Sequence, residues 1–191
     1  MPRPKQKPTR RVRLGIPLLL GAAFLAAAAL YLRGRSADRF ERWAAEGAPR
    51  LAGRVVEEPV RGNRHIPPGW RIRYPSPIPT SGPHRANDAP PGFYPPGKRP
   101  ELARLVHNLE HGDVVIYYDA PGEAVLDILR AWAERFPQPF QAVLVVPMPG
   151  LGAKVVLTAW GRRLELEPFD PSLAAAFIDR YRGRGPERRV R

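Results

Sequence analysis

Cysteine is missing from all 191 residues of this chain. Its absence excludes a disulfide framework, a thiolate metal site and a cysteine nucleophile. Any bound metal ion must therefore be held by nitrogen and oxygen ligands. Also missing are a G-x-S-x-G nucleophile elbow, a phosphate-binding glycine loop and a dinucleotide-binding fingerprint. No familiar catalytic arrangement of those kinds is available.

Acidic residues are scarce, and the formal net charge is +13. Much of the excess lies in residues 1–13 and in a basic tail, residues 182–191. No basic helix carries interleaved aromatic residues that could stack on bases, so we expect no nucleic-acid partner.

Charge is absent altogether from residues 14–32, "LGIPLLLGAAFLAAAALYL". A helix of that length spans about 28 Å, close to the hydrocarbon core of a bilayer. The run is too long for the apolar part of a usual signal peptide, so we expect a retained transmembrane helix. The basic flank before it places residues 1–13 in the cytoplasm and the C-terminal domain outside it, at the cell membrane.

The segment after this helix, residues 33–60, reads as a juxtamembrane stalk in which Phe40 and Trp43 rest at the membrane interface. A proline-rich stretch follows, since 12 of the 25 prolines fall between Pro59 and Pro100. Large apolar residues are spread through it, and we therefore expect an ordered loop laid over a folded core.

Regular structure is predicted from residue 101 onward. Apolar spacing of three and four predicts helices over residues 101–111 and 121–137, and Asp170 with Pro171 starts another. Strands are predicted over residues 113–119, 141–147, 153–161 and 162–168. The fold class is α+β: a small mixed β-sheet with two or three packed helices and the long loop, in an exported globular domain of residues 61–181. Six apolar residues should form the sheet core, with Ile128 and Trp132 packed onto it: Val114, Ile116, Val143, Val145, Val155 and Leu157.

All four histidines lie between positions 65 and 111. His107 and His111 are four residues apart, which places them on one face of a helix. Rigid proline turns hold His65 and His84. We expect these four histidines to bind a transition metal, copper or zinc, with Glu110 or Asp113 as an extra ligand or a supporting group. The alternative is that the histidines are structural, in a non-catalytic interaction domain.

A second alternative comes from "HNLEH", which matches the H-x-x-E-H pattern of inverted zincins. In a metal-dependent hydrolase of that kind, His107 and His111 would bind zinc and Glu110 would be the catalytic base. Glu165 and Glu167 are the candidates for the third ligand. The pattern is short and the chain small, so we lean towards a protein that is not an enzyme.

Several motifs together resemble a known family: "HIPPGW", "PTSGPH", "GFY", "LVHNLEHGDVVIYY" and "LTAWGR". They are similar to those of the domain of unknown function 3105, and they cover about Arg61 to Tyr181. The resemblance implies a bacterial protein with one N-terminal membrane segment and no established activity. All four histidines and Glu110 fall inside the matching motifs or directly beside them.

Overall fold

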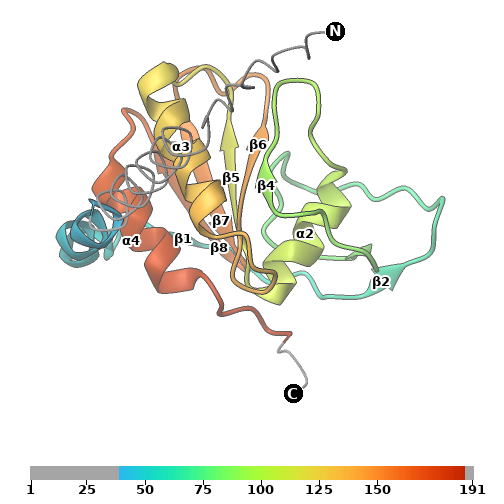
Figure 1. Ribbon diagram of the computed structural model, residues 1–191. Coiled ribbons are helices and arrows are strands. Elements are labelled where there is room, and N and C mark those ends of the chain that lie inside the picture. The colour runs from blue at the N-terminus through green and yellow to red at the C-terminus, as the bar shows by residue number, and fades with distance from the viewer. Residues whose placement is uncertain (1–38, 188–191) are drawn as a thin grey trace, which may run out of the picture. The chain divides into compact units, whose positions relative to one another are not determined.

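The computed structural model describes residues 39–187, and the transmembrane helix predicted for residues 14–32 lies outside that range (Figure 1). Within residues 39–187, no helix has both the length and the apolar character needed to cross a bilayer. The described part is a mixed α+β fold, as predicted, with four helices around a six-stranded sheet.

The main sheet has the strand order β1-β8-β7-β5-β6-β4. Its strands are β1 (Val56–Glu57), β4 (Gly92–Phe93), β5 (Val114–Tyr118), β6 (Val143–Pro147), β7 (Val155–Ala159) and β8 (Arg162–Leu166). β6 is parallel to both β4 and β5, whereas β7 and β8 run antiparallel to their neighbours. The sheet is therefore mixed, and β5 is a central strand whose five residues are all buried.

Helices cover both faces of this sheet. On one face lie the helix of residues 39–51, α3 (Glu123–Arg135) and α4 (Pro171–Tyr181), and on the other lies α2 (Leu102–His111) (Figure 1). Side chains alternate along β5, so that Ile116 belongs to the first core cluster and Val115 to the second. All six residues predicted for the sheet core are fully buried, and Trp132 packs against them with the partly buried Ile128.

The interpretation of Phe40 as a membrane-interface residue is wrong. Residues 39–51 form a helix, and the Phe40 side chain is 1% exposed, in edge contact with Trp132 and Phe136. Trp43 is partly buried against the same cluster. The sequence could not distinguish these two environments, because aromatic residues after an apolar run occur both at membrane interfaces and on buried faces of helices.

The proline-rich stretch is ordered, as predicted, and lies against α2 and the sheet. Ile78 and Ala89 are buried in the second core cluster with Leu105 and Leu109 of α2. Two short strands within the stretch, β2 (His65–Ile66) and β3 (His84–Arg85), form a separate parallel pair. The loop thus belongs to the fold and carries secondary structure of its own.

Candidate metal centre

The C-terminal half of α2 carries His107, Glu110 and His111. The helix is held on the sheet by Leu105 and Leu109, which are fully buried, and it ends at Gly112 in a left-handed conformation (φ 99°). The rings of His107 and His111 lie with centroids 4.3 Å apart. The prediction that this pair shares one face of a helix is confirmed.

The parallel pair of β2 and β3 brings His65 and His84 side by side. Their Cα atoms are direct partners in the register, and the His84 amide donates a 3.0 Å hydrogen bond to the Arg64 carbonyl. Partners in adjacent strands project their side chains to the same side. This pairing aligns two imidazoles that are 19 positions apart in the sequence.

Polar anchors fix the turn before His84. Thr80 donates a 2.7 Å hydrogen bond to the Glu58 carboxylate, and the Ser81 hydroxyl accepts one from the Arg61 amide at 3.0 Å. Gly82 adopts a φ of 125°, which few other residues tolerate. The first five residues of "PTSGPH" therefore form a rigid turn that fixes the position of His84, the last residue of the motif.

A buried amide ties the loop to α2. Asn108 is fully buried, and its side chain both accepts from the Ala89 amide (2.8 Å) and donates to the Ala89 carbonyl (3.0 Å). It also donates to Asp113, whose carboxylate accepts from the Ala142 amide on the approach to β6. Asp113, named from the sequence as a possible ligand, is used in this structural network; burial raises the pKa of its carboxyl.

Three of the four histidines converge with Glu110. The ring centroids are 5.0 Å apart for His65 and His84, and 4.9 Å apart from His107 to each of them. One ligand atom from each of His65, His84, His107 and Glu110 lies within 4.8 Å of all the others. We call this set the inner group.

His111 departs from the predicted ligand set, because it does not join His65 and His84. It groups instead with His107 and Glu187, again with ligand atoms within 4.8 Å of one another, and we call this set the outer group. Helical phase accounts for the split. At about 100° per residue, Glu110 is displaced about 60° to one side of His107 and His111 about 40° to the other. His107 lies between them and belongs to both groups.

The contact of His84 with Glu110 is short and unusual. Nδ1 of His84 lies 2.8 Å from the Gly82 carbonyl oxygen, and Nε2 lies 2.9 Å from Oε2 of Glu110. Although the second distance is that of a hydrogen bond, the direction is not, and Nε2 has no hydrogen-bond partner. Nδ1 of His107 and Nδ1 of His111 are likewise buried without one. The side chain of His84 is fully buried, and that of Glu110 is 4% exposed.

Apolar rings shield this cluster. Trp160 makes an edge contact with His84 at 6.3 Å, and Phe140 stacks on His111 at 4.0 Å from a backbone with φ 70°. Burial, followed by the neighbouring imidazoles, lowers the pKa of His107 below 6.5. A neutral imidazole is the form that binds metal, so this shift favours ligation.

The predicted third ligands of a zincin are elsewhere. Glu165 is exposed on β8 and pairs with Lys154 at 3.1 Å, and Glu167 is exposed beyond the end of that strand. The carboxylate beside His107 and His111 is Glu187, which the sequence analysis assigned to the basic tail. Asp88, Phe140 and Trp160 were missed as well. Only Asp88 and Trp160 carried a signal, since they lie close to or within the "PTSGPH" and "LTAWGR" motifs.

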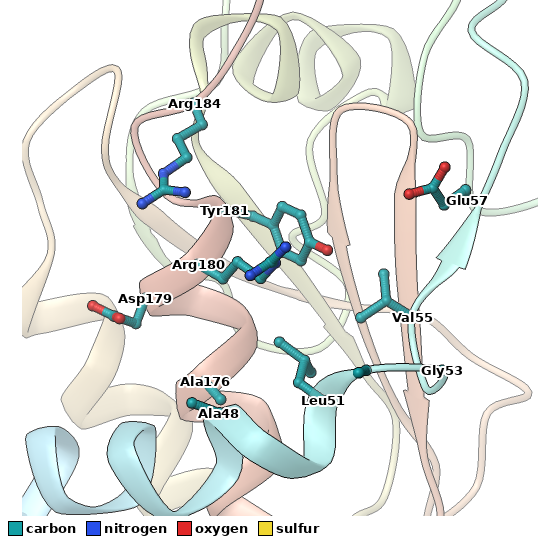
Figure 2. Close-up of a pocket in the computed structure, with 11 residues that line it drawn as sticks. Ala48, Leu51, Gly53, Val55, Glu57, Ala176, Asp179, Arg180, Tyr181 and Arg184 are labelled. Atoms are coloured by element: carbon teal, nitrogen blue, oxygen red, sulfur yellow. The ribbon is translucent and has the colours of Figure 1, made fainter.

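Two of the hollows in the described surface have volumes of about 400 Å³ or more. One, of about 440 Å³, borders the cluster and is lined by Asn63, His65, Glu110, Pro186 and Glu187. The other, of about 400 Å³, has none of the histidines in its lining. Figure 2 shows this second hollow between the end of the 39–51 helix and α4, with Leu51 and Val55 on one side and Arg180 and Tyr181 on the other. Of the residues with metal-binding chemistry, His65, Glu110 and Glu187 line the first hollow.

Comparison with known proteins gives one match. The family model described as Protein of unknown function (DUF3105) matches residues 65–191, a range that includes all four histidines, Glu110 and Glu187. No curated protein and no solved structure matches the chain. The resemblance indicated by the motifs is thereby confirmed.

Proposed function

The chain belongs to the family Protein of unknown function (DUF3105), and from its clustered side chains we propose that it binds a transition metal ion through His65, His84, His107 and Glu110. These groups offer three imidazoles and one carboxylate, which suit zinc or copper(II). Four protein ligands can complete the coordination of zinc, so a handling or structural role fits this set better than catalysis.

The His84–Glu110 contact carries the proposal. Carbonyl oxygens only accept hydrogen bonds, so the 2.8 Å contact with Gly82 assigns the proton of a neutral His84 to Nδ1. Nε2 then carries the lone pair and lies 2.9 Å from the Glu110 carboxylate, so both atoms are acceptors. Two buried acceptors at that distance repel each other unless a proton or a metal ion lies between them. A metal ion resolves the conflict and uses both lone pairs.

The distances are compatible with one ion. Ligand atoms about 2.0–2.1 Å from zinc lie about 2.9 Å apart at a right angle and about 3.3 Å apart at the tetrahedral angle. The His84–Glu110 separation of 2.9 Å falls in this range, whereas the 4.8 Å limit of the inner group is wider. On binding, no pair would need to close by more than about 1.5 Å, the difference between 4.8 Å and the tetrahedral separation. His65, the exposed member on a two-residue strand, is the side chain best able to move.

Metal analysis of the purified protein tests this proposal. We expect about one equivalent of zinc or copper after loading and dialysis, and a 10–100-fold weaker affinity in His84→Ala and His107→Ala. Glu134→Gln, which removes an exposed carboxylate on α3, is the control and should bind like the wild type. A wild-type protein that stays free of metal after incubation with both ions would leave the histidines with a structural role only.

The proposal includes a location. The charge-free residues 14–32 and their basic flank support a single membrane span with the metal-binding domain outside the cytoplasm. The membrane is then the one partner we propose. A reporter fused after Arg191 that is active only outside the cytoplasm would support this topology. Activity of a cytoplasmic reporter at the same position would overturn it.

A further inference from the structure

The outer group is a second set of ligands beside the inner one. It consists of His107, His111 and Glu187, and Asp88 approaches the far side of the His111 ring. Nε2 of His111 lies 3.3 Å from Oε2 of Glu187, and Nδ1 lies 3.5 Å from Oδ2 of Asp88. A carboxylate behind a ligating imidazole is the usual support of a metal-bound histidine, since it orients the ring and raises its basicity.

Glu187 reaches this place through contacts of the main chain. The amide of Glu187 donates to the Glu110 carbonyl at 3.1 Å, and the amide of Gly183 donates to the Gly112 carbonyl at 2.8 Å. Gly185 lies so close to the end of α2 that a Cβ atom there would be 2.0 Å from the Glu110 carbonyl oxygen. Residues 182–187 therefore lie firmly along the helix end, and Glu187 is held beside the two histidines.

The ligands differ in exposure: His65 of the inner group is exposed, whereas the other three members of that group are buried. The side chains of His84, Glu110 and His107 are 0%, 4% and 6% exposed, while His111 is 11% and Glu187 is 45% exposed. Glu187 also lines the 440 Å³ hollow together with His65 and Glu110. An ion arriving from solvent can reach Glu187 before it reaches His84.

His107 cannot serve both groups at once. A neutral imidazole has one nitrogen that carries a proton and one with a free lone pair, so it binds a single ion. Its Nε2 lies 3.7 Å from Glu187, and its Nδ1 is buried without a hydrogen-bond partner. One ion can therefore occupy either group, and His107 remains a ligand in both, with its ring proton on whichever nitrogen does not face the ion.

From these observations we propose that His107, His111 and Glu187 form an outer metal position that exchanges a single ion with the inner position through His107. The outer position has three protein ligands and so keeps a coordination site open, whereas the inner position has four. The outer one is then the place of capture and release, and the inner one the place of retention. This inference rests on the proposed metal-binding function.

Exchange kinetics of the full chain test the proposal. We would load the protein with zinc and follow its transfer to an excess of a chromophoric chelator, for the wild type, Glu187→Gln and His111→Gln. We expect both variants to keep an equilibrium affinity within about threefold of the wild type, because the inner group is intact. Their uptake and release of zinc should be slowed on the order of tenfold, an effect the size of losing a supporting group at a metal site. Glu134→Gln should exchange like the wild type, and thermal unfolding of each variant checks that it is folded.

The outcomes separate this inference from the proposed function. No zinc bound by the wild type removes the metal site altogether. If the wild type binds zinc and both variants are folded but exchange zinc at the wild-type rate, the outer position is refuted and the inner site remains. Two equivalents of zinc at saturation also overturn it, because two ions cannot share one neutral imidazole. One equivalent, with slowed exchange in both variants, supports it.

Discussion

The effect of Glu110→Gln on the stability of the protein should change sign when zinc is added. Without metal, the substituted amide can rotate to donate a hydrogen bond to Nε2 of His84, where the wild type has two acceptors 2.9 Å apart. A hydrogen bond contributes about 0.5–1.5 kcal/mol, and leaving a buried polar group unsatisfied costs about 1–3 kcal/mol. We therefore expect the metal-free variant to be more stable than the wild type by about 1 kcal/mol, or about 2–4 °C in melting temperature.

With zinc in excess, the order should invert. Replacing one of four ligands by an amide should weaken affinity by at least the 10–100-fold that loss of a group supporting a ligand costs, which is at least about 1.4–2.7 kcal/mol of binding free energy. This loss of binding free energy is larger than the stability, about 1 kcal/mol, that the substitution adds to the metal-free protein. The zinc-loaded wild type should then melt above the zinc-loaded variant.

Thermal unfolding followed by circular dichroism, with and without zinc, measures both effects. Glu134→Gln should match the wild type within about 0.5 kcal/mol in either condition, since it changes an exposed carboxylate outside the site. A metal-free Glu110→Gln that is less stable than the wild type by 1 kcal/mol or more would refute the reasoning. In that case Nε2 of His84 carries a proton, and the contact is a buried ion pair rather than a pair of ligands.

Three further predictions concern other parts of the molecule. His65→Ala should weaken zinc binding about 10–100-fold in a competition assay but leave the metal-free melting temperature unchanged, because His65 is exposed. Phe40→Ala should cost about 3–5 kcal/mol in urea unfolding, whereas Trp70→Ala, at a side chain 62% exposed, should cost under about 0.5 kcal/mol; equal losses would contradict the packing of the 39–51 helix. Burial lowers the pKa of His107 from its ordinary value of about 6.5. At a pH between the folded and the unfolded pKa, the unfolded chain therefore binds more protons than the folded chain. The folded protein accordingly loses stability as the pH falls below about 6.5. Melting of the metal-free protein between pH 5 and 7.5 should therefore show a shallower decline in His107→Gln, and a decline of the same slope would contradict it.

Most of the fold follows from local sequence patterns. The helices α2, α3 and α4 and the strands β5 to β8 were predicted from periodicity and from end signals such as Asp170, whose carboxylate accepts from the amides of Ser172 and Leu173. Local rules failed at residues 39–51, where the helix is stabilised by burial against α3 and α4. No local sequence pattern predicts this contact, because α3 and α4 lie far from residues 39–51 in the sequence.

The site was predicted in its composition more than in its arrangement. The four-residue spacing of His107 and His111 predicts that they share one face of a helix. The proline-rich loop was expected to bring His65 and His84 to the same site. Which of Glu110 and His111 meets His84 depends on the rotation of α2 about its axis, and the core residues Leu105 and Leu109 set that rotation. Glu187 was out of reach, because main-chain contacts at Gly112 and Gly185 place it, and such contacts leave no side-chain pattern.

The short pairing of β2 and β3 has a consequence for local unfolding. The amides of Gly82 and His84 donate to the carbonyls of Gly62 and Arg64 at a strand pairing of only two residues, whereas β5 pairs with β6 over five residues and with β7 over three. Such a segment opens more readily than the sheet, and its amides exchange with deuterium first. An ion bound to His65, His84 and α2 would hold the loop in its folded position and so suppress this local unfolding. At a free zinc concentration 100 times the dissociation constant, this adds about 2.7 kcal/mol, enough to slow exchange at Gly82 and His84 about 100-fold. The amides of β5 exchange only when the sheet itself opens, which also destroys the metal site, so zinc should slow their exchange as well, from a rate that is already lower in the metal-free protein.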